Sequence, residues 1–449
     1  MNKQSQIAIR QHIALRAPDA LKPAERNART HSRKQLREIA RSIQRFGFTN
    51  PVLVDEDDRI LAGHGRVAAA RELGMAAIPV LCIGSLSPSE RRAYVLADNK
   101  LALNAGWDQD ILALELQELI DMDFEVELTG FSLAEIDLTL DAARQASPNG
   151  HNEMADIIPA IGEQPVCRSG ELWELERHRL LCGDARAPED YGALMKGDDA
   201  DIVFADPPYN VPIDGHVSGL GKVRHREFAM GAGEMTAIQF EDFLACSLGN
   251  MARHCRSGAI LFVCMDWRHM RELCEAGDAT GLELKNLVVW NKTNGGMGSF
   301  YRSKHELIFV FKHGDDPHVN SFGLGETGRY RTNVWDYPGI SSMSASRQSE
   351  LAMHPTVKPV ALVADALRDC SRRGDIVLDP FGGSGTTLIA AHQTGRTARL
   401  IEFDPLYCDT IIRRFEQITG KLARLASTRE TFETLEQDRC SLKGGGHER

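Results

Sequence analysis

The chain has 449 residues, of which 43% are apolar and 26% are charged, a composition typical of soluble globular proteins with more than one domain. No apolar run approaches the ~18 residues that a membrane helix needs, and the N-terminus has no apolar signal core, so we expect a cytoplasmic protein without a membrane segment. The ten cysteines are scattered without C-x-x-C spacing, which argues against a disulfide framework and a thiolate metal site, and we expect no metal.

The net charge of −11 argues against nucleic acid as a partner, but the charges are unevenly distributed. Residues 1–50 hold eleven Lys and Arg against three Asp and Glu, whereas residues 101–150 hold one Arg against eleven Asp and Glu. This asymmetry indicates a basic region beside an acidic helical segment. On charge alone, a solvated surface explains the pattern equally well.

Residues 1–107 alternate short strands with helices and form a first α+β domain. Apolar residues at helical spacing predict a helix over 32–46, and strands follow at 51–54 and 78–83. Gly63-His64-Gly65-Arg66 stands directly before a helix at 67–73. Ser87-Pro88-Ser89-Glu90 has the pattern of a capping box and predicts the start of a further helix.

Residues 108–160 form an acidic segment of two helices followed by a linker. The linker sequence Ala146-Ser147-Pro148-Asn149-Gly150 is rich in turn residues. We therefore place the domain boundary between 145 and 165.

Residues 165–426 change to short apolar runs that alternate with helices, which indicates an α/β sheet of the doubly wound type. The tail at 427–449 is charged, ends in a glycine run and is expected to be mobile. The expected strands are 179–182, 200–205, 259–264, 284–290, 306–311, 375–378 and 397–401, and the expected helices are 237–253, 267–276, 360–370, 386–393 and 405–420.

The strongest chemical signal is Asp206-Pro207-Pro208-Tyr209, directly after the apolar run 201–205. Ligands of open α/β sheets bind at the carboxyl ends of strands, where this tetrad falls. The two prolines remove two backbone donors, the Asp adds an acceptor, and the Tyr offers a stacking face. Such a set suits a planar group with an exocyclic amine, although a proline-rich turn is the plain structural alternative.

The second signal is Asp379-Pro380-Phe381-Gly382-Gly383-Ser384-Gly385-Thr386-Thr387, between an expected strand and an expected helix. A glycine-rich turn at this position can hold a nucleotide or nucleoside against backbone amides. The turn lacks the Gly-Lys-Ser/Thr ending of a P-loop, so triphosphate hydrolysis is not implied. Glu402 ends the following strand, where a carboxylate can accept from two ribose hydroxyls.

Together these two motifs resemble those of the amino-group DNA methyltransferases that use S-adenosylmethionine. Further similar segments lie between and before them, namely Leu181-Cys182-Gly183-Asp184, Arg302-Ser303-Lys304-His305-Glu306, Asn333-Val334-Trp335 and His354-Pro355-Thr356-Val357-Lys358-Pro359. The tetrad precedes the glycine turn, which is similar to the circularly reordered β arrangement of that family. The resemblance implies a Rossmann-like methyltransferase sheet with S-adenosylmethionine as cofactor.

The resemblance also implies roles for individual residues. Asp206 and the Pro207 carbonyl, with Pro208 completing the tetrad, would hold the amine of a flipped base, and Tyr209 would stack on its ring. The residues implied to surround the cofactor are Asp184, Thr356, Lys358, Asp379, Phe381, Gly382, Gly383, Ser384, Gly385, Thr386 and Glu402.

The expected partner is double-stranded DNA. The glycine-rich stretch 217–233 carries Lys222, Arg224 and Arg226, which would contact the phosphate backbone, with a plain surface loop as the alternative. The polar insert 312–353, with Arg329 and Arg331, is the candidate for target recognition. A second copy of the chain is a further candidate partner, whereas the sequence does not predict whether a restriction enzyme accompanies it.

Residues 21–108 resemble the ParB/sulfiredoxin-like domain through Asn50-Pro51-Val52, Gly63-His64-Gly65-Arg66 and Ala97-Asp98-Asn99-Lys100. Gly63, His64, Gly65 and Arg66, at a helix N-terminus, are candidates for binding a phosphate. The box lacks the cysteine of the sulfiredoxin branch and the fuller arginine set of the partition proteins. An accessory DNA-contacting domain without catalysis is therefore the favoured interpretation.

We conclude from the sequence that the chain is a site-specific DNA methyltransferase, with adenine N6 as the favoured target. Asp at the first position of the tetrad goes mostly with adenine in the family that it resembles. The alternatives are methylation of cytosine N4 and, in a different class, a ParB-like DNA-binding nucleotide switch whose methyltransferase fold is not catalytic. A methyltransferase of RNA or protein also remains open.

Overall fold

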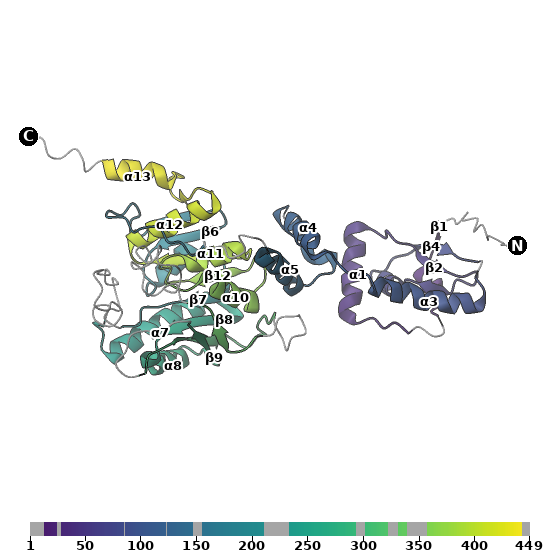
Figure 1. The fold of residues 1–449 in the computed structure, drawn as a ribbon, viewed down its shortest axis with the longest axis horizontal. Coiled ribbons are helices and arrows are strands. Elements are labelled where there is room, and N and C mark those ends of the chain that lie inside the picture. The colour runs from purple at the N-terminus through teal and green to yellow at the C-terminus, as the bar shows by residue number, and fades with distance from the viewer. Residues whose placement is uncertain are drawn as a thin grey trace, which may run out of the picture. The chain divides into compact units, whose positions relative to one another are not determined.

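The computed structural model describes residues 13–24, 28–84, 86–122, 124–146, 155–210, 233–292, 301–321, 331–338 and 357–441. Its contacts divide the chain into two compact units, Met1–Ala143 and Arg144–Arg449 (Figure 1). No helix in these ranges is long and apolar enough to cross a membrane.

The first unit contains a four-stranded mixed sheet in the order β1-β4-β2-β3. Its small core lies between this sheet and the neighbouring helices and includes Val52, Ile60, Val67 and Ile78. The elements of this unit are β1 (Ile13–Arg16), η1 (Pro18–Ala20), α1 (Arg33–Phe46), β2 (Val52–Val54), β3 (Ile60–Ala62), α2 (His64–Glu72), β4 (Ile78–Cys82), α3 (Pro88–Leu103), α4 (Gln109–Asp121), η2 (Val126–Thr129) and α5 (Leu133–Ala146).

The acidic helices α4 and α5 share a separate apolar cluster that includes Leu116, Val126 and Ile136. This cluster is joined to the basic helix α1, because Arg41 forms an ion pair with Glu125 and Phe46 stacks on Phe124 with 6.2 Å between the ring centroids. The two oppositely charged segments of the sequence are therefore in direct contact through η2.

The second unit is built on a ten-stranded sheet in the order β11-β9-β10-β8-β7-β12-β13-β6-β5-β14. The strands from β8 to β6 run parallel, whereas β10 is antiparallel to both β8 and β9. Its elements are β5 (Leu172–Leu175), β6 (His178–Cys182), α6 (Pro188–Met195), β7 (Ala200–Ala205), α7 (Ala237–Arg253), β8 (Cys255–Met265), η3 (Trp267–His269), α8 (Met270–Ala279), β9 (Glu283–Asn291), β10 (His305–Lys312), β11 (Val334–Asp336), α10 (Val360–Cys370), β12 (Ile376–Asp379), α11 (Thr386–Gln393), β13 (Thr397–Glu402), α12 (Pro405–Thr419), β14 (Arg424–Leu425) and α13 (Phe432–Ser441).

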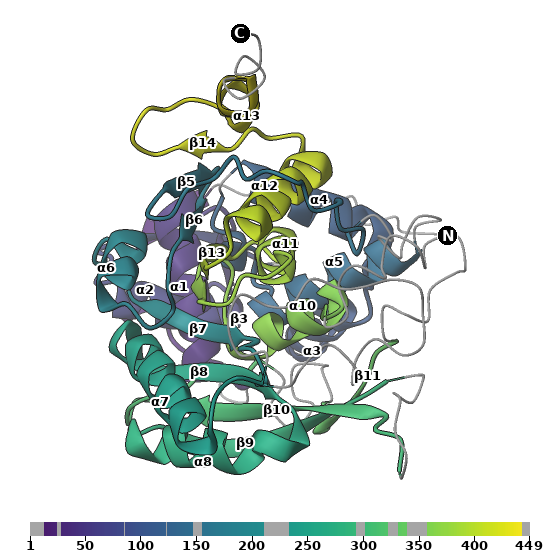
Figure 2. The same cartoon turned by 90° about the vertical axis from the view of Figure 1, so that its left-hand side faces the viewer.

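Both faces of this sheet are buried, which explains why its strands read as continuous apolar runs. On β7, Ile202 and Phe204 pack into the core shared with α10, α11 and α12, while Val203 and Ala205 pack into the core shared with α6, α7 and α8. Figure 2 shows α7 and α8 on one side of the sheet and α10 and α11 on the other. The unit is a three-layer α/β/α structure, which confirms the expected fold class.

The strand order brings distant parts of the sequence together. The late strands β12 and β13 lie between the early strands β6 and β7, and all four run parallel. Their carboxyl ends therefore meet at one edge, where Cys182, Ala205, Asp379 and Glu402 are the last residues of the four strands. The tetrad and the glycine-rich turn therefore both lie at this edge of the sheet.

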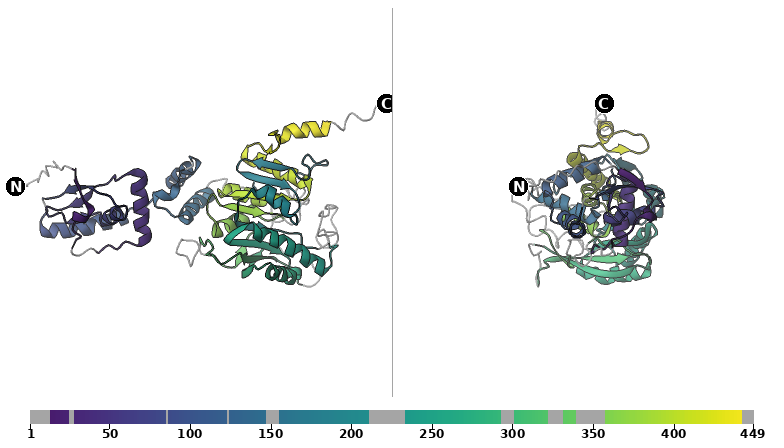
Figure 3. Two further views of the ribbon diagram at one scale, coloured as in Figure 1. Left: turned by 180° about the vertical axis from the view of Figure 1, so that it is seen from behind. Right: turned by 90° about the vertical axis from the view of Figure 1, so that its right-hand side faces the viewer.

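The C-terminal segment differs from the mobile tail expected after Ala426. Residues up to 441 are described, and the ribbon ends in the helix α13, yellow in Figure 3. Phe432 of α13 packs against the buried Trp173, with 5.6 Å between the ring centroids. Arg439 on the same helix pairs with Glu171 at 2.7 Å. Of the described charged residues, Arg429, Glu436 and Arg439 form ion pairs, and the aromatic contact supplies burial for this segment.

Candidate functional site

The tetrad Asp206–Tyr209 follows β7 without a break, at the carboxyl edge of the sheet. The Tyr209 hydroxyl donates to Asp206 Oδ1 at 2.7 Å, so the first and last residues of the tetrad are bonded to each other. Tyr209 also packs against both apolar cores, which fixes its ring. The Asp206 and Tyr209 side chains therefore meet within four residues of the chain.

The buried ammonium of Lys358 lies beside this pair. Its Nζ donates to Asp206 Oδ2 at 2.6 Å and to the Tyr209 hydroxyl at 3.2 Å, and the Lys358 side chain is only 3% exposed. Lys358, which we expected at the cofactor, contacts Asp206 and Tyr209 of the tetrad in the structure. Sequence spacing alone does not show this, because 152 residues separate the two partners.

Glu306, at the start of β10, completes the cluster and was missed as a site residue. Its Oε2 lies 3.1 Å from Lys358 Nζ, and its Oε1 accepts from Lys292. The sequence did contain a signal for Glu306, because the segment Arg302–Glu306 supported the family resemblance, but we assigned Glu306 no role there. The cluster therefore contains two carboxylates and two ammonium groups.

The charges in this cluster stabilise one another. Burial raises the pKa of Glu306, but the ammonium groups of Lys358 and Lys292 outweigh it and lower that pKa to about 2. Burial likewise lowers the pKa of Lys358, but the carboxylates of Asp206 and Glu306 raise it above its usual value. Burial raises the pKa of Asp206, and Lys358 opposes that rise. Lys358 thus favours the anionic form of Asp206 in a buried position.

Asn210 fixes the end of the tetrad. Its side-chain amide donates to the Met235 carbonyl at 2.8 Å, and its Oδ1 accepts from the Met235 amide at 3.2 Å. Asn210 has a φ of +51°, a left-handed conformation that Asn tolerates better than most residues. The tetrad is thereby tied to the residue just before α7.

On the neighbouring strands, Glu402 organises the glycine turn. Its Oε2 accepts from the Gly383 amide at 2.7 Å and its Oε1 from the Asp404 amide at 2.8 Å. Asp379 accepts from the Phe381 amide at 3.0 Å. The carboxylates at the ends of β12 and β13 therefore each accept a hydrogen bond from a backbone amide of the turn.

The three glycines of the turn have different surroundings. A Cβ at Gly382 or Gly385 would lie 3.1–3.2 Å from Ile411 of α12, so these two positions allow the helix to pack closely. A Cβ at Gly383 would meet only the Phe381 carbonyl, at 3.8 Å. Gly383 thus presents backbone to open space, as expected where a ligand approaches the turn.

Three parts of the chain match families of known proteins. The DNA methylase family matches residues 200–413, the ParB N-terminal domain matches residues 2–100, and the ParB-methyltransferase HTH domain matches residues 110–169. The chain therefore contains an N6/N4 DNA methylase domain and a ParB N-terminal domain.

Individual relatives resemble the two halves separately. The ParB-like nuclease domain-containing protein YnaK of Escherichia coli is 45% identical over 80 residues, which are 18% of this chain and 92% of YnaK. The type II methyltransferase M2.MboI of Moraxella bovis is 23% identical over 243 residues, 52% of this chain and 86% of that protein. The crystal structure of the M1.HpyAVI–SAM complex is similar to 52% of this chain at 20% identity, covers 97% of its own chain and has a TM-score of 0.38.

The methyl donor of this methylase family is S-adenosylmethionine, and the glycine turn fits its nucleoside part. Each oxygen of Glu402 uses one lone pair on a backbone amide, which leaves acceptor capacity for the two hydroxyls of a ribose. Gly383 leaves space for the ligand to approach the backbone. Phe381 packs near Phe243, with 6.0 Å between the ring centroids, and forms an apolar wall of the turn.

Three residues expected at the cofactor have side-chain contacts with arginines in the structure. Ser384 and Thr386 both accept from the guanidinium of the buried Arg414, at 3.3 Å through their hydroxyls. Asp184 accepts from Arg186, with 2.6 Å between Oδ2 and Nη2. The sequence shows that polar side chains follow the strands, but not which way they point, and the arginines decide that.

We expect cofactor affinity to depend on pH through Glu402. Burial raises the pKa of Glu402 to about 7, so its carboxylate becomes protonated as the pH falls through neutrality. A protonated carboxyl is a poorer acceptor for two hydroxyls, so the Kd of S-adenosylhomocysteine should rise by up to about tenfold per pH unit below 7. Calorimetry between pH 6 and 8 measures this.

The matched variant is Glu402→Gln, which should bind more weakly at pH 8 and lose most of the slope. Burial also raises the pKa of Asp379 to about 7, so a residual slope in the variant reports that second group. A wild-type affinity that stays flat between pH 6 and 8 would contradict the assignment of Glu402.

Arg331, which we expected to contact DNA, contacts acidic residues of α10 in the structure. Its Nε donates to Asp369 Oδ2 at 3.0 Å, its Nη1 lies 3.5 Å from Asp365, and the guanidinium lies 4.6 Å from the centroid of the Trp335 ring. The side chain is 19% exposed and joins β11 to α10. The other residues expected at DNA or cofactor, Lys222, Arg224, Arg226, Arg329 and Thr356, lie outside the described residues.

In the ParB domain, Gly63–Arg66 forms the start of α2. Gly63 is the N-cap with a φ of +102°, and Gly65 is buried against His31 and Ile39. His64 Nε2 accepts from the Ala24 amide at 3.2 Å, and burial lowers the pKa of His64. His64 therefore has a structural contact, and the phosphate site here stays a prediction.

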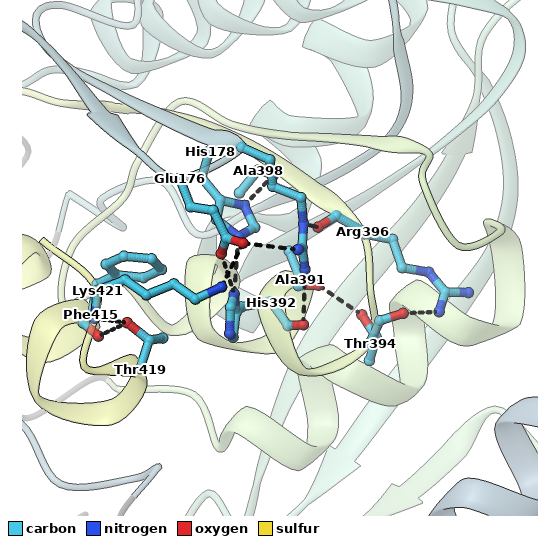
Figure 4. A network of polar contacts seen from close by, with 11 residues as sticks. Glu176, His178, Ala391, His392, Thr394, Arg396, Ala398, Phe415, Thr419 and Lys421 are labelled. Carbon is cyan, nitrogen blue, oxygen red and sulfur yellow. Dashed lines mark hydrogen bonds and ion pairs between the residues drawn. The ribbon is translucent and has the colours of Figure 1, made fainter. Parts of the chain in front are cut away.

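A cluster of Glu176, His178 and His392 lies outside the site (Figure 4). The Ala398 amide donates to His178 Nδ1 at 2.9 Å, so Nε2 carries the ring proton and donates to His392 Nδ1 at 3.3 Å. Both nitrogens of His178 are thus engaged, and Lys421 is bonded to Glu176 at 2.5 Å. These contacts form a hydrogen-bonded network that joins β6 to α11, rather than a set of free lone pairs for a metal ion.

Proposed function

We propose that this DNA methylase transfers a methyl group from S-adenosylmethionine to N6 of adenine at specific sites in double-stranded DNA. The observation that carries the proposal is the carboxylate of Asp206, placed at the carboxyl edge of β7 and held by the Tyr209 hydroxyl and by Lys358. An amine-accepting side chain beside a nucleoside-fitting turn is the arrangement that amino methylation needs.

The target base has to leave the duplex, because its amine cannot be reached inside the stack. In the site, Asp206 accepts one N–H of the amine and the Pro207 carbonyl accepts the other. These bonds orient the nitrogen and localise its lone pair, which is otherwise delocalised into the ring. The cofactor supplies an electrophilic methyl group, and the acceleration comes from position and electrostatics.

Lys358 and Tyr209 prepare Asp206 for this role. The ammonium favours the charged form of a carboxyl that burial would otherwise tend to protonate. The Tyr209 hydroxyl occupies one oxygen of Asp206 and fixes its rotamer, while the ring offers a face for stacking on the flipped base. Glu306 balances the positive charge of Lys358 and also pairs with Lys292.

The identity of the methylated nucleoside shows whether the target base is adenine or cytosine. Both bases carry an exocyclic amine beside a ring nitrogen, and Tyr209 can stack on either. We expect N6-methyladenine because Asp206 accepts through a full negative charge, whereas the cytosine enzymes of the family mostly have Ser at this position.

The measurement is to expose DNA to the enzyme and the cofactor, digest the DNA to nucleosides and identify the modified one by mass. A matched reaction with Asp206→Ala controls for contaminating methylases. N4-methyl-2′-deoxycytidine without N6-methyl-2′-deoxyadenosine would overturn the adenine assignment and leave the enzyme class intact. No methyl incorporation at all would favour the alternative of a non-catalytic ParB-like switch.

The DNA partner is supported by a basic ridge on α1. Arg33, Arg37, Arg41 and Arg45 follow one another at four-residue spacing and are exposed. Arg41 pairs with Glu125 and Arg45 lies over the Phe124 ring, so Arg33 and Arg37 are the two proposed to contact phosphates. Residues four apart lie about 6 Å apart along a helix axis, which matches the scale of successive phosphates on a strand. We propose that this ridge contacts the DNA backbone.

We expect Arg33→Gln/Arg37→Gln to weaken DNA binding mainly at low salt. Each phosphate contact contributes about 0.9 to the slope of log K against log salt, so the slope should fall by roughly two. Fluorescence anisotropy at several salt concentrations measures it. Lys421→Gln/Arg424→Gln on the methylase unit removes the same charge and serves as control. An unchanged slope in the α1 variant would mean that the ridge faces another partner.

A further inference from the structure

The segment at the start of the methylase unit, Ala155–Asp156, contacts both sides of the candidate site. Ala155 O accepts from Arg414, which holds the glycine turn, and Asp156 accepts from Val360, two residues after Lys358. We propose that Arg414 and Asp156 are positioning residues that hold the cofactor side and the base side of the site in a fixed relation. This inference rests on the proposed function.

Arg414 connects this segment to the glycine turn. The residue is 1% exposed on α12 and donates through Nη1 to Ser384 O at 2.8 Å, and through Nη2 to Ala155 O at 2.6 Å. Burial lowers the pKa of this guanidinium to about 10, which shows how strongly the site is desolvated. An apolar side chain would fill the same volume at a lower desolvation cost, but it would leave two buried carbonyls without a donor.

Asp156 connects the same segment to Lys358. The Val360 amide, at the start of α10, donates to Asp156 Oδ1 at 3.0 Å. Pro359 is the N-cap of α10 and has no side-chain acceptor for this amide, so Asp156 supplies the cap from 204 residues away in the sequence. The negative charge of Asp156 also opposes the fall in the pKa of Arg414. One residue thus interacts with both the helix start and the arginine.

These contacts predict two separable effects. Arg414 acts on the backbone of Ser384, beside Gly383, so its loss should weaken cofactor binding. Asp156 acts on the start of α10, and so on the direction from which Lys358 reaches Asp206. Its loss should therefore lower kcat with little effect on cofactor affinity.

The experiment uses the full chain and two variants at each position. We expect Arg414→Leu to raise the calorimetric Kd of S-adenosylhomocysteine at least tenfold, and Arg414→Lys to raise it less, because Lys can still donate to one carbonyl. We expect Asp156→Ala to lower kcat about tenfold with Kd within threefold. Asp156→Asn keeps the acceptor for Val360 and should restore most of kcat.

Hydrogen exchange provides a readout that does not depend on activity. The first-turn amides of α10 should exchange faster in Asp156→Ala than in Asp156→Asn. Arg413→Ala is the matched control for Arg414, because the neighbouring Arg413 pairs with Glu436 of α13 and contacts neither side of the site. Asp108→Ala removes an aspartate cap from α4 in the other unit and controls for the loss of a cap.

The outcomes separate this inference from the proposed function. A wild-type chain that does not bind S-adenosylhomocysteine would contradict the cofactor assignment itself. A wild type that binds, together with Arg414→Leu and Arg414→Lys of unchanged affinity, would overturn the inference about Arg414. Equal kcat losses in Asp156→Asn and Asp156→Ala, or a loss in the Arg413 control as large as in Arg414→Leu, would show general destabilisation in place of positioning.

Discussion

Asp206→Ala should lower the rate of methyl transfer by at least about a hundredfold while leaving the affinity for the cofactor within a few-fold. Losing a charge-assisted hydrogen bond costs about 1.5–3 kcal/mol, and misorientation of the amine adds to that loss. The cofactor affinity should persist because Asp206 follows β7 and does not belong to the glycine turn. Transfer of labelled methyl groups to DNA and calorimetry with S-adenosylhomocysteine measure the two quantities.

Asp201→Ala is the matched control for this variant. Asp201 lies on the same strand, and its carboxylate pairs with Arg256 at 2.6 Å, away from the tetrad. The control should lose some stability and retain turnover. Near-wild-type turnover in Asp206→Ala would remove this carboxylate from the mechanism.

Lys358→Met should destabilise the methylase unit and abolish activity together. It leaves the carboxylates of Asp206 and Glu306 in a site where the lysine was 3% exposed. Removing one partner of a buried ion pair typically costs about 3–5 kcal/mol, because the remaining charge has no compensation. Thermal unfolding followed by circular dichroism should show a clear fall in Tm.

The pH dependence of this variant has a defined sign. Without the ammonium, the folded-state pKa of Asp206, which burial already raises, rises further, and the lowered pKa of Glu306 rises although Lys292 still opposes burial. The folded state then binds more protons, so the deficit in stability should shrink as the pH falls. Lys358→Met/Glu306→Gln should recover part of the loss, and Lys292→Met, at a more exposed lysine, should cost less. A Tm close to that of the wild type in Lys358→Met would show that the cluster is not held by charge.

The sequence predicted most of the elements that carry the site. The strand at 200–205 and the helix at 386–393 were placed as the structure has them, and the two motifs lie where those elements end or begin. Such predictions succeed because apolar periodicity, proline and glycine act over a few residues. Strands β1, β3, β5, β11 and β14 and helices α6 and α13 were missed, since they are short or rich in charged residues.

Which side chains meet was decided by the tertiary structure. By itself, the sequence determined the fold class, the tetrad with its acceptor and the glycine turn with its downstream acid, since each is a local pattern of residue types. The strand order inserts β12 and β13 between β6 and β7. Only this tertiary arrangement decided that Lys358 contacts Asp206, that Glu306 contacts Lys358 and that Arg414 contacts Ser384. The physical reason is that a buried charge must find its partner wherever the packed chain provides one, and here the partners are 30 to 152 residues apart in the sequence.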